Sequence, residues 1–398
     1  MKKVLLIFIS WRIALVLVLL IGYSFITQRS GYEYTLFSNY LFHEGLSNNE
    51  LNYLLSVYAN FDGVHYITIA YQGYTVNAGF FPLFPIIISL IAKALSFVLP
   101  IDLHLLIFYS GLVINVLFSI TGLLFFYKLL KLDYKAHLIY QVVLFLLCFP
   151  TSFFFAAIYS ESLFFLLLVL TFYFTRRKQW FIAALFASLL TATRPIGIAI
   201  LPAILFELYV QKKIDYKKLF HQPLQYVSLW LTAFFVTAVS LLGIGIYSLF
   251  NYQKWHDFLY FIHAQGEFKN NRTVSSIVFF PQTIYRYIKI LFTVSSSQFE
   301  WWIALLELST FFFICLLLFI AWKQKVRMSY IIFAILSFLI PISTGTFSSL
   351  PRYALVLFPI FIALALIKSK TIKIICVVIG IILQILLFLL FSKGYFVG

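Results

Sequence analysis

The sequence predicts an all-α, polytopic membrane protein. Of its 398 residues, 63% are hydrophobic and 11% are charged, whereas soluble domains are about half apolar and a quarter charged. Apolar runs of about 20 residues, enough for a helix to cross a bilayer, recur from one end of the chain to the other. We therefore expect a single membrane-embedded domain over residues 1–398, with about 11 or 12 transmembrane helices.

The net charge of +16 does not indicate nucleic-acid binding, because a basic binding face needs a soluble surface to carry it. The basic residues instead fall in short clusters between apolar runs, as expected for cytoplasmic loops. These clusters lie at 128–135, 176–178, 212–218, 323–327 and 368–373. They predict five polar segments on the opposite face, at 150–162, 193–195, 251–272, 343–352 and the C-terminus.

The elements follow in order from the N-terminus. Residues 4–26 read as an uncleaved first helix with a cytoplasmic N-terminus, and 27–79 as a long first extracytoplasmic loop with short amphipathic helices. Apolar runs then occupy 80–99, 105–130, 137–149, 153–174, 180–193, 196–210 and 224–250. A second polar segment spans 251–300, and the last runs are 301–322, 330–342, 354–367 and 374–391.

One topological conflict stays open at this point. If 27–79 is outside and two full crossings occupy 80–130, the basic cluster at 128–135 is outside too. Either one of these runs is re-entrant, or this cluster breaks the positive-inside rule.

The three cysteines, Cys148, Cys315 and Cys376, all lie in apolar runs. We interpret them as buried small hydrophobes. Neither a metal-ligand spacing nor a disulfide framework is present in the sequence, so no metal and no cofactor is expected.

Asp62 and His65 are three residues apart, just before an apolar run, and would share one face of a helical turn. A polar pair at a membrane boundary indicates a function. Asp62 is either a helix cap or a general base that takes a proton from an attacking hydroxyl. His65 either orients Asp62, contacts a phosphate, or is a hydrogen-bonded boundary histidine.

Glu161 opens an apolar helix and is the only acid between Asp133 and Glu207. It either belongs to a helix N-terminus capped by Ser160 or lines a cavity, because Pro150 interrupts the preceding apolar run.

Arg194 and Arg352 each lie beside a proline between apolar runs. Each is either a boundary arginine that reaches water or a ligand for phosphate, which guanidinium binds through paired hydrogen bonds. The 251–272 segment, with Trp255, His256, Asp257, Gln265 and Arg272, is either a sugar platform or an interfacial anchor.

Short motifs spread over nearly the whole chain resemble, in the same order, those of the PIG-V family. This family comprises the GPI mannosyltransferase that adds the second mannose and its bacterial relatives. The motifs are Phe61-Asp62-Gly63-Val64-His65-Tyr66, Gly73-Tyr74, Phe80-Phe81-Pro82-Leu83-Phe84-Pro85, Tyr159-Ser160-Glu161-Ser162-Leu163-Phe164, Thr193-Arg194 with Gly197, Pro351-Arg352-Tyr353 and Gly394-Tyr395-Phe396-Val397.

This resemblance implies a GT-C glycosyltransferase fold with an extracytoplasmic active site. Such enzymes take a sugar from a polyprenyl or dolichyl phosphate and invert the anomeric centre. The family's catalytic acid in the first external loop falls on Asp62. The implied substrate-binding residues are His65, Tyr66, Glu161, Arg194 and Arg352.

The function that these residues predict is an inverting mannosyltransferase in the cell membrane. Its expected partners are the bilayer, a polyprenyl-phosphate sugar donor and a lipid-linked or surface glycan acceptor. This chain is shorter than the eukaryotic relatives, which act on a GPI precursor, so the acceptor stays open. Two alternatives also stay open: a multi-pass transporter or flippase, and a non-catalytic subunit that acts with a protein partner.

Overall fold

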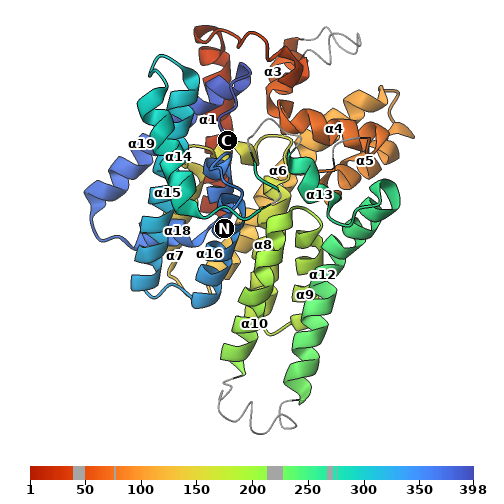
Figure 1. Ribbon diagram of the computed structural model, residues 1–398, viewed down its shortest axis with the longest axis vertical. Coiled ribbons are helices and arrows are strands. Elements are labelled where there is room, and N and C mark those ends of the chain that lie inside the picture. The colour runs from red at the N-terminus through yellow and green to blue at the C-terminus, as the bar shows by residue number, and fades with distance from the viewer. Residues whose placement is uncertain (39–49, 76–77, 213–226, 267–271, 275) are drawn as a thin grey trace.

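The computed structural model describes residues 1–398 apart from 39–49, 76–77, 213–226, 267–271 and 275 (Figure 1). Every regular element among the described residues is a helix, which confirms the all-α class. Within the described ranges, five helices are long and apolar enough to cross a membrane. They are α1 (Lys2–Gly22), α6 (Leu103–Leu130), α12 (Val227–Trp255), α15 (Phe299–Lys323) and α19 (Lys370–Ser392).

Shorter apolar helices pack among these five and complete a polytopic helical membrane protein. They are α5 (Leu83–Ser96), α7 (Ala136–Leu147), α9 (Trp180–Thr191), α10 (Ile200–Gln211) and α16 (Met328–Ile342). The predicted number of transmembrane helices, about 11 or 12, depends on how many of these short helices cross the bilayer completely, and it stays a prediction.

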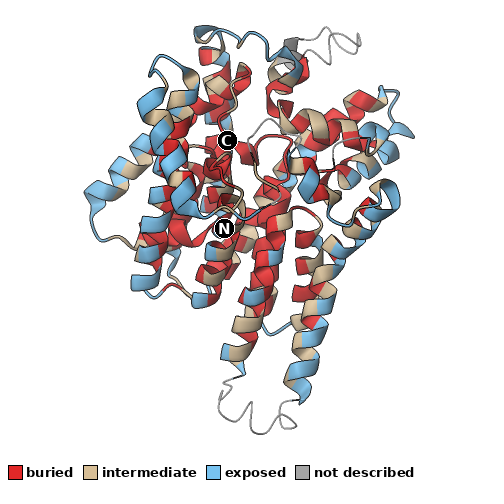
Figure 2. Cartoon of the chain, in the orientation of Figure 1, coloured by how far each residue is buried: buried red, intermediate tan, exposed pale blue. Residues whose placement is uncertain are grey.

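Helix α8 (Glu161–Arg176) lies at the centre of the bundle, against α6, α9 and α10. Its sequence is apolar on all sides, a pattern typical of a helix that is covered all round. Nearly all of its residues are buried (Figure 2). The neighbouring pair α9 and α12 packs closely at Gly243, where a Cβ atom would lie 1.9 Å from the Ser188 carbonyl oxygen. Each end of α8 lies in a group of paired charged side chains, and both groups are described below.

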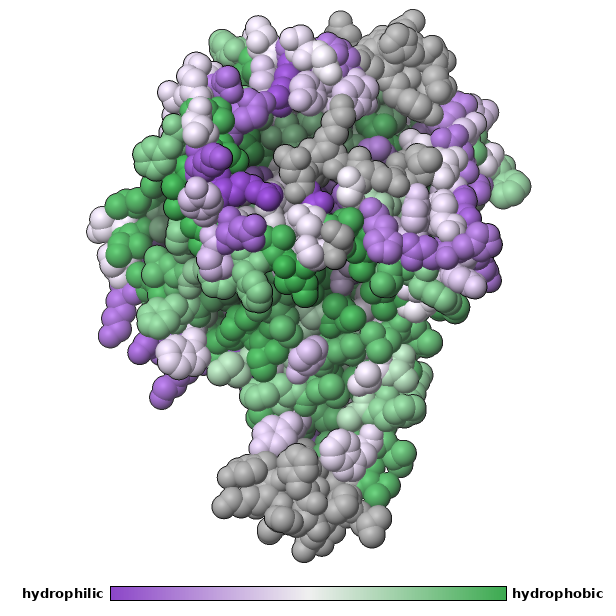
Figure 3. Space-filling model, viewed as in Figure 1, coloured by the Kyte–Doolittle hydropathy of each residue, from purple (hydrophilic) through white to green (hydrophobic). Residues whose placement is uncertain are grey.

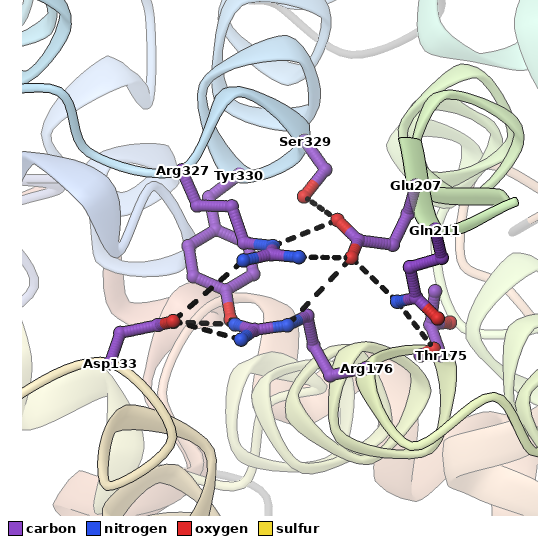
Figure 4. A network of polar contacts seen from close by, with 8 residues as sticks. All are labelled: Asp133, Thr175, Arg176, Glu207, Gln211, Arg327, Ser329 and Tyr330. Carbon is purple, nitrogen blue, oxygen red and sulfur yellow. Dashed lines mark hydrogen bonds and ion pairs between the residues drawn. The ribbon is translucent and has the colours of Figure 1, made fainter. Parts of the chain in front are cut away.

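At the C-terminal end of α8, two arginines and two carboxylates form the helix-end network: Asp133, Arg176, Glu207 and Arg327 (Figure 4). Arg176 binds Asp133 at 2.5 Å, and Arg327 binds Glu207 at 2.5 Å. Longer contacts of 3.7 Å cross-link the two pairs. The network joins the end of α6 to α8, α10 and α16, so these helix ends lie together.

This arrangement bears on the conflict over residues 80–130. The network places the cluster at 128–135 at the same end of the bundle as those at 176–178 and 323–327. Helix α5 has 14 residues, about 21 Å at 1.5 Å per residue, which is shorter than the roughly 30 Å core of a bilayer. A first run that does not cross completely agrees with this length and with the shared end of the basic clusters, and it stays a prediction. Lys213, Lys217 and Lys218 of the 212–218 cluster lie outside the described residues.

The segment 27–79 carries the short helices that the sequence predicts there. They are η2 (Glu33–Thr35), α3 (Glu50–Ser56), η3 (Val57–Ala59) and α4 (Asp62–Gln72). The second polar segment contains α13 (Tyr260–His263), η7 (Ala264–Gly266) and the amphipathic α14 (Phe280–Thr293). In Figure 3 the lower part of the visible face is mostly hydrophobic, and hydrophilic side chains gather above it.

The C-terminal part of the chain returns to the middle of the bundle (Figure 1). It contains α17 (Leu350–Tyr353), η8 (Ala354–Val356), α18 (Pro359–Leu366) and α19. After α19 the chain turns at Gly394, where φ is +85°. Val397 is buried, and the carbonyl of Gly398 accepts a hydrogen bond from the Ser349 hydroxyl at 2.9 Å. This tail packs beside the short helix that carries Arg352.

Candidate active site

A cavity of about 500 Å³ opens at the N-terminal end of α8, opposite the helix-end network. Its polar part includes Asp62, Arg194, Arg272, Arg352 and Tyr353. Its apolar part comes from other segments, with Ile196, Ile262, Ile277, Ile340 and Phe396 among the lining side chains. All five segments predicted to share this face supply either cavity-lining residues or the buried charges beneath them. The cavity therefore suits a ligand with one charged end and one apolar part.

Asp62 is the first residue of α4, directly after a backbone position with unusual geometry. Phe61 has φ 55° and ψ −113°, a region that costs a non-glycine residue about 1–3 kcal/mol. The Phe61 amide donates a hydrogen bond to the Thr35 carbonyl at 2.8 Å. Arg352 Nη1 donates to Asp62 Oδ2 at 2.5 Å, and no described residue donates a hydrogen bond to Oδ1. One carboxylate oxygen is thus fixed, and the other is free to accept a proton.

Four residues form the pocket network: Asp62, Glu161, Arg194 and Arg352. Arg194 Nη1 binds Glu161 Oε1 at 2.6 Å, and Arg352 Nε lies 3.3 Å from the same oxygen. Glu161 is 1% exposed, and its Oε2 has no hydrogen-bond partner among the described residues. Ser160 makes no side-chain cap of α8. Glu161 is therefore neither at a helix end capped by Ser160 nor among the cavity-lining residues; it is buried behind Arg194 and Arg352, which do line the cavity.

Arg194 lies between α9 and the 3₁₀ helix η5 (Pro195–Ala199), which begins with a proline at its first position. Gly197 lets this helix approach α9 closely, because a Cβ there would lie 2.8 Å from the Leu190 carbonyl oxygen. Any larger residue would push Arg194 away from Glu161. The guanidinium of Arg194 also lies over the Tyr353 ring, 5.0 Å from its centroid.

Arg352 is carried by α17, which also follows a strained residue, since Ser349 has φ 66°. The Ser349 amide donates to Glu307 Oε1 at 3.2 Å. The Tyr287 hydroxyl donates to Glu307 Oε2 at 2.5 Å and accepts from the Phe347 amide at 3.0 Å. These bonds fix the loop that presents Arg352 to Asp62, a support that the sequence analysis did not anticipate.

Tyr353 lies among three guanidinium groups. Arg272 Nη2 donates to its hydroxyl at 3.3 Å, and Arg194 and Arg352 lie over its ring. Burial alone would raise the pKa of Tyr353, but the charges of Arg272, Arg194 and Arg352 outweigh it and lower the pKa to about 7. A phenol that is half ionised at neutral pH marks this part of the cavity as strongly anion-attracting.

Tyr66 and His65 differ in their relation to the cavity. Tyr66 lines it, and its hydroxyl donates to Ser160 Oγ at 2.9 Å. The ring of His65 stacks on Phe80 with centroids 4.8 Å apart, and His65 is not among the lining residues. Burial lowers the pKa of His65, and the nearby Asp62 charge offsets this only in part. A neutral imidazole that does not line the cavity argues against a phosphate contact.

Some residues of the 251–272 segment only pack against one another, and others line the cavity. Trp255 stacks on Tyr260, and Asp257 pairs with His263 at 2.5 Å. Neither Trp255, Asp257 nor His256 lines the cavity, whereas Gln265 and Arg272 do. The sequence left this segment as either a sugar platform or an interfacial anchor. It gave Arg272 no role as an anion ligand, since Arg272 lies outside every motif of the resemblance. No group of three or more metal-ligating side chains occurs within the described ranges, so no residues are assigned to a metal.

Comparison with known proteins gives one result that bears on this site. The family model described as mannosyltransferase (PIG-V) matches residues 1–293. This match covers more than half of the chain and includes Asp62, Glu161, Arg194 and Arg272; Arg352 and Tyr353 lie beyond it. No curated protein matches the sequence.

Proposed function

The chain belongs to the PIG-V mannosyltransferase family, and from that premise we propose that it transfers mannose from an isoprenyl-phosphate donor to a glycan acceptor. The donor class, the inverting course and the role of each residue are part of this proposal. The acceptor is a lipid-linked or surface glycan. The whole chain acts as one catalytic domain in the membrane.

The reaction is a single displacement. An acceptor hydroxyl attacks the anomeric carbon, and its proton passes to the carboxylate of Asp62. The bond between the anomeric carbon and the phosphate oxygen breaks, through a transition state that resembles an oxocarbenium ion. The isoprenyl phosphate leaves with the electron pair and one additional negative charge, which nearby guanidinium groups stabilise.

The observation that carries this proposal is the meeting of Asp62 with a cluster of arginines in one partly apolar cavity. The carboxylate keeps one oxygen without a hydrogen bond from the described residues, next to space for an acceptor. Three arginines line the same cavity and suit a phosphate, while Ile196, Ile277 and Ile340 suit the adjoining lipid. A base, an anion site and a lipid-compatible wall are the parts that this displacement requires.

The same geometry supports a side of the membrane for the site. The basic clusters at 128–135, 176–178 and 323–327 lie at the end of the bundle that holds the helix-end network, and the cavity opens at the other end of α8. If the positive-inside rule holds, the cavity faces the extracytoplasmic side. A transporter would instead place its ligand at a midplane site between paired repeats, and a single site at one end of α8 favours the transferase.

Lipid-linked mannosyl transfer by purified protein in proteoliposomes tests the proposal. Asp62→Asn keeps the shape of the side chain and an acceptor for Arg352, so the protein should fold while transfer falls by about 10²–10⁴-fold. Asp102→Asn is the matched control, because Asp102 caps α6 through the His104 amide and asparagine caps equally well. Transfer by Asp62→Asn at the rate of the control would remove Asp62 as the base. Activity of the purified chain alone would exclude the subunit alternative.

A further inference from the structure

The three arginines of the cavity are not equivalent, because two of them already have carboxylate partners. Arg194 pairs with Glu161 at 2.6 Å, and Arg352 pairs with Asp62 at 2.5 Å. A guanidinium held by a buried carboxylate has its charge largely compensated. Neither arginine is therefore free to neutralise an incoming anion without loosening its own ion pair.

Arg272 has no such partner. No carboxylate of the described residues forms an ion pair with it, and its Nε is buried without a hydrogen bond. Its contacts are Gln265 Oε1 at 2.8 Å and the Tyr353 hydroxyl at 3.3 Å. Glu307 attracts it from a longer distance, but both oxygens of that carboxylate already accept bonds from Tyr287 and Ser349. Arg272 is half-buried and lines the cavity, so its guanidinium is within reach of an incoming anion and is not held by an ion pair with a described carboxylate.

The backbone around Arg272 is fixed before any ligand arrives. The adjacent Thr273 amide donates to the Thr344 carbonyl at 2.8 Å, and the Val278 amide donates to Ser343 at 2.9 Å. Gln265 in turn donates through Nε2 to the Gly79 carbonyl at 3.0 Å. Arg272 is thus positioned by two loops from distant parts of the chain, so little ordering remains for binding.

The surroundings of Arg272 define the anion. The hydroxyl-bearing residues Thr273 and Ser276 line the same cavity, as do the apolar residues Val274 and Ile277. Hydroxyl groups and a guanidinium bind phosphate oxygens, and the apolar side chains accommodate a hydrocarbon next to it. The chemical class indicated is a phosphate ester of an isoprenoid alcohol.

We propose that Arg272 is the residue that receives the phosphate of the isoprenyl donor, with Arg194 and Arg352 serving to position Glu161 and Asp62. This inference rests on the proposed function for the identity of the lipid, and it assigns the anion to a residue that the sequence motifs did not indicate. In the absence of ligand the Tyr353 hydroxyl and Gln265 Oε1 occupy the hydrogen-bonding positions that phosphate oxygens would take. Binding replaces these two partners with phosphate oxygens.

The test is equilibrium binding of citronellyl phosphate, a short isoprenyl phosphate, to the full-length protein in detergent. Citronellol and inorganic phosphate are the comparison ligands. The wild-type protein should bind citronellyl phosphate at least tenfold more tightly than either. Arg272→Gln should lose about tenfold or more in affinity, and Arg272→Lys should lose less because it keeps the charge. Arg177→Gln, which removes an exposed arginine at the other end of α8, should bind as the wild type does.

Equal affinity of Arg272→Gln and the wild type would overturn the inference, as would wild-type protein that binds citronellol as tightly as its phosphate. Far-UV circular dichroism and the melting temperature establish that each variant is folded, and Arg272→Lys provides a second readout if Arg272→Gln does not fold. Protein that binds citronellyl phosphate through Arg272 yet transfers no mannose would contradict the proposed function and support this inference, so the two failures are distinguishable.

Discussion

The two ends of α8 carry the same kinds of charged residues, but these residues differ in how completely they are paired by hydrogen bonds and ion pairs. In the helix-end network, two arginines face two carboxylates, and Glu207 accepts further bonds from Ser329 and Gln211 (Figure 4). In the cavity, three arginines face two carboxylates, and Glu161 Oε2 and Arg272 Nε have no hydrogen-bond partner among the described residues. The charges of the helix-end network balance, although Gln211 Oε1 beside it has no hydrogen-bond partner among the described residues; the cavity has one arginine more than the carboxylates paired there, next to open space.

This difference separates a structural network from a functional one. A buried polar network whose members are all paired rigidifies the fold, whereas a partly satisfied one reduces stability. Unsatisfied groups and strained residues such as Phe61 and Ser349 persist where function requires them. Variants at the two ends of α8 should therefore fail in different ways, and the predictions below are arranged from the largest expected effect to the smallest.

Glu161→Gln should have the largest combined effect, because Glu161 holds both Arg194 and Arg352. Loss of its charge leaves two buried guanidinium groups competing for Asp62. We expect a loss of roughly 3–5 kcal/mol in stability and at least a 10²-fold loss in transfer per folded molecule. Thermal unfolding in detergent and the transfer assay measure the two effects. If Glu161→Gln loses stability but keeps wild-type transfer per folded molecule, the role of Glu161 is structural only.

Glu207→Gln should reduce stability by roughly 3 kcal/mol, because it removes the buried partner of Arg327. The amide keeps bonds to Ser329 and Gln211, but the ion pair is lost. Transfer per folded molecule should stay within twofold of the wild type, as this network lies at the far end of α8. Asp133→Asn is the graded comparison, with a smaller loss expected since its side chain is 21% exposed. A selective loss of transfer in Glu207→Gln would mean that the two ends are coupled.

The contrast also shows which parts of the site were visible in the sequence. Asp62 stood out because a carboxylate and an imidazole preceded an apolar run, and Arg194 because it interrupted two of them. The pairing of Arg194 with Glu161 joins residues 33 positions apart, which no local pattern reveals. Arg272 was overlooked as an anion ligand because its lack of a carboxylate partner is a property of the folded chain.

The sequence likewise predicted the fold class and some of the elements, but not where each helix ends. Hydropathy identified the all-α membrane class, and the short helices of 27–79 followed from its amphipathic pieces. The conflict over 80–130 could not be resolved from the sequence, because an apolar run does not show where its helix ends. Helix α5 ends at Ser96, and Arg176 brings Asp133 to the other basic clusters; both facts depend on tertiary packing.

Tyr353→Phe should have the smallest effect, and it should appear only in the pH dependence. With its pKa lowered to about 7, Tyr353 becomes a phenolate as the pH rises from 6 to 8. The new negative charge beside Arg272 then opposes the phosphate. Wild-type affinity for citronellyl phosphate should fall roughly three- to tenfold over this range relative to Tyr353→Phe. Parallel pH profiles for the two proteins would show that the phenol does not ionise near the bound anion.

The most direct test compares one variant from each end of α8 in both assays. Asp62→Asn and Glu207→Gln are each measured for mannosyl transfer per folded molecule and for melting temperature. The account predicts that Asp62→Asn loses transfer by about 10²–10⁴-fold with a melting temperature within about 2 °C of the wild type. Glu207→Gln should melt several degrees lower and retain transfer. Near-wild-type transfer by folded Asp62→Asn would contradict the central claim that this carboxylate is the base of a membrane mannosyltransferase.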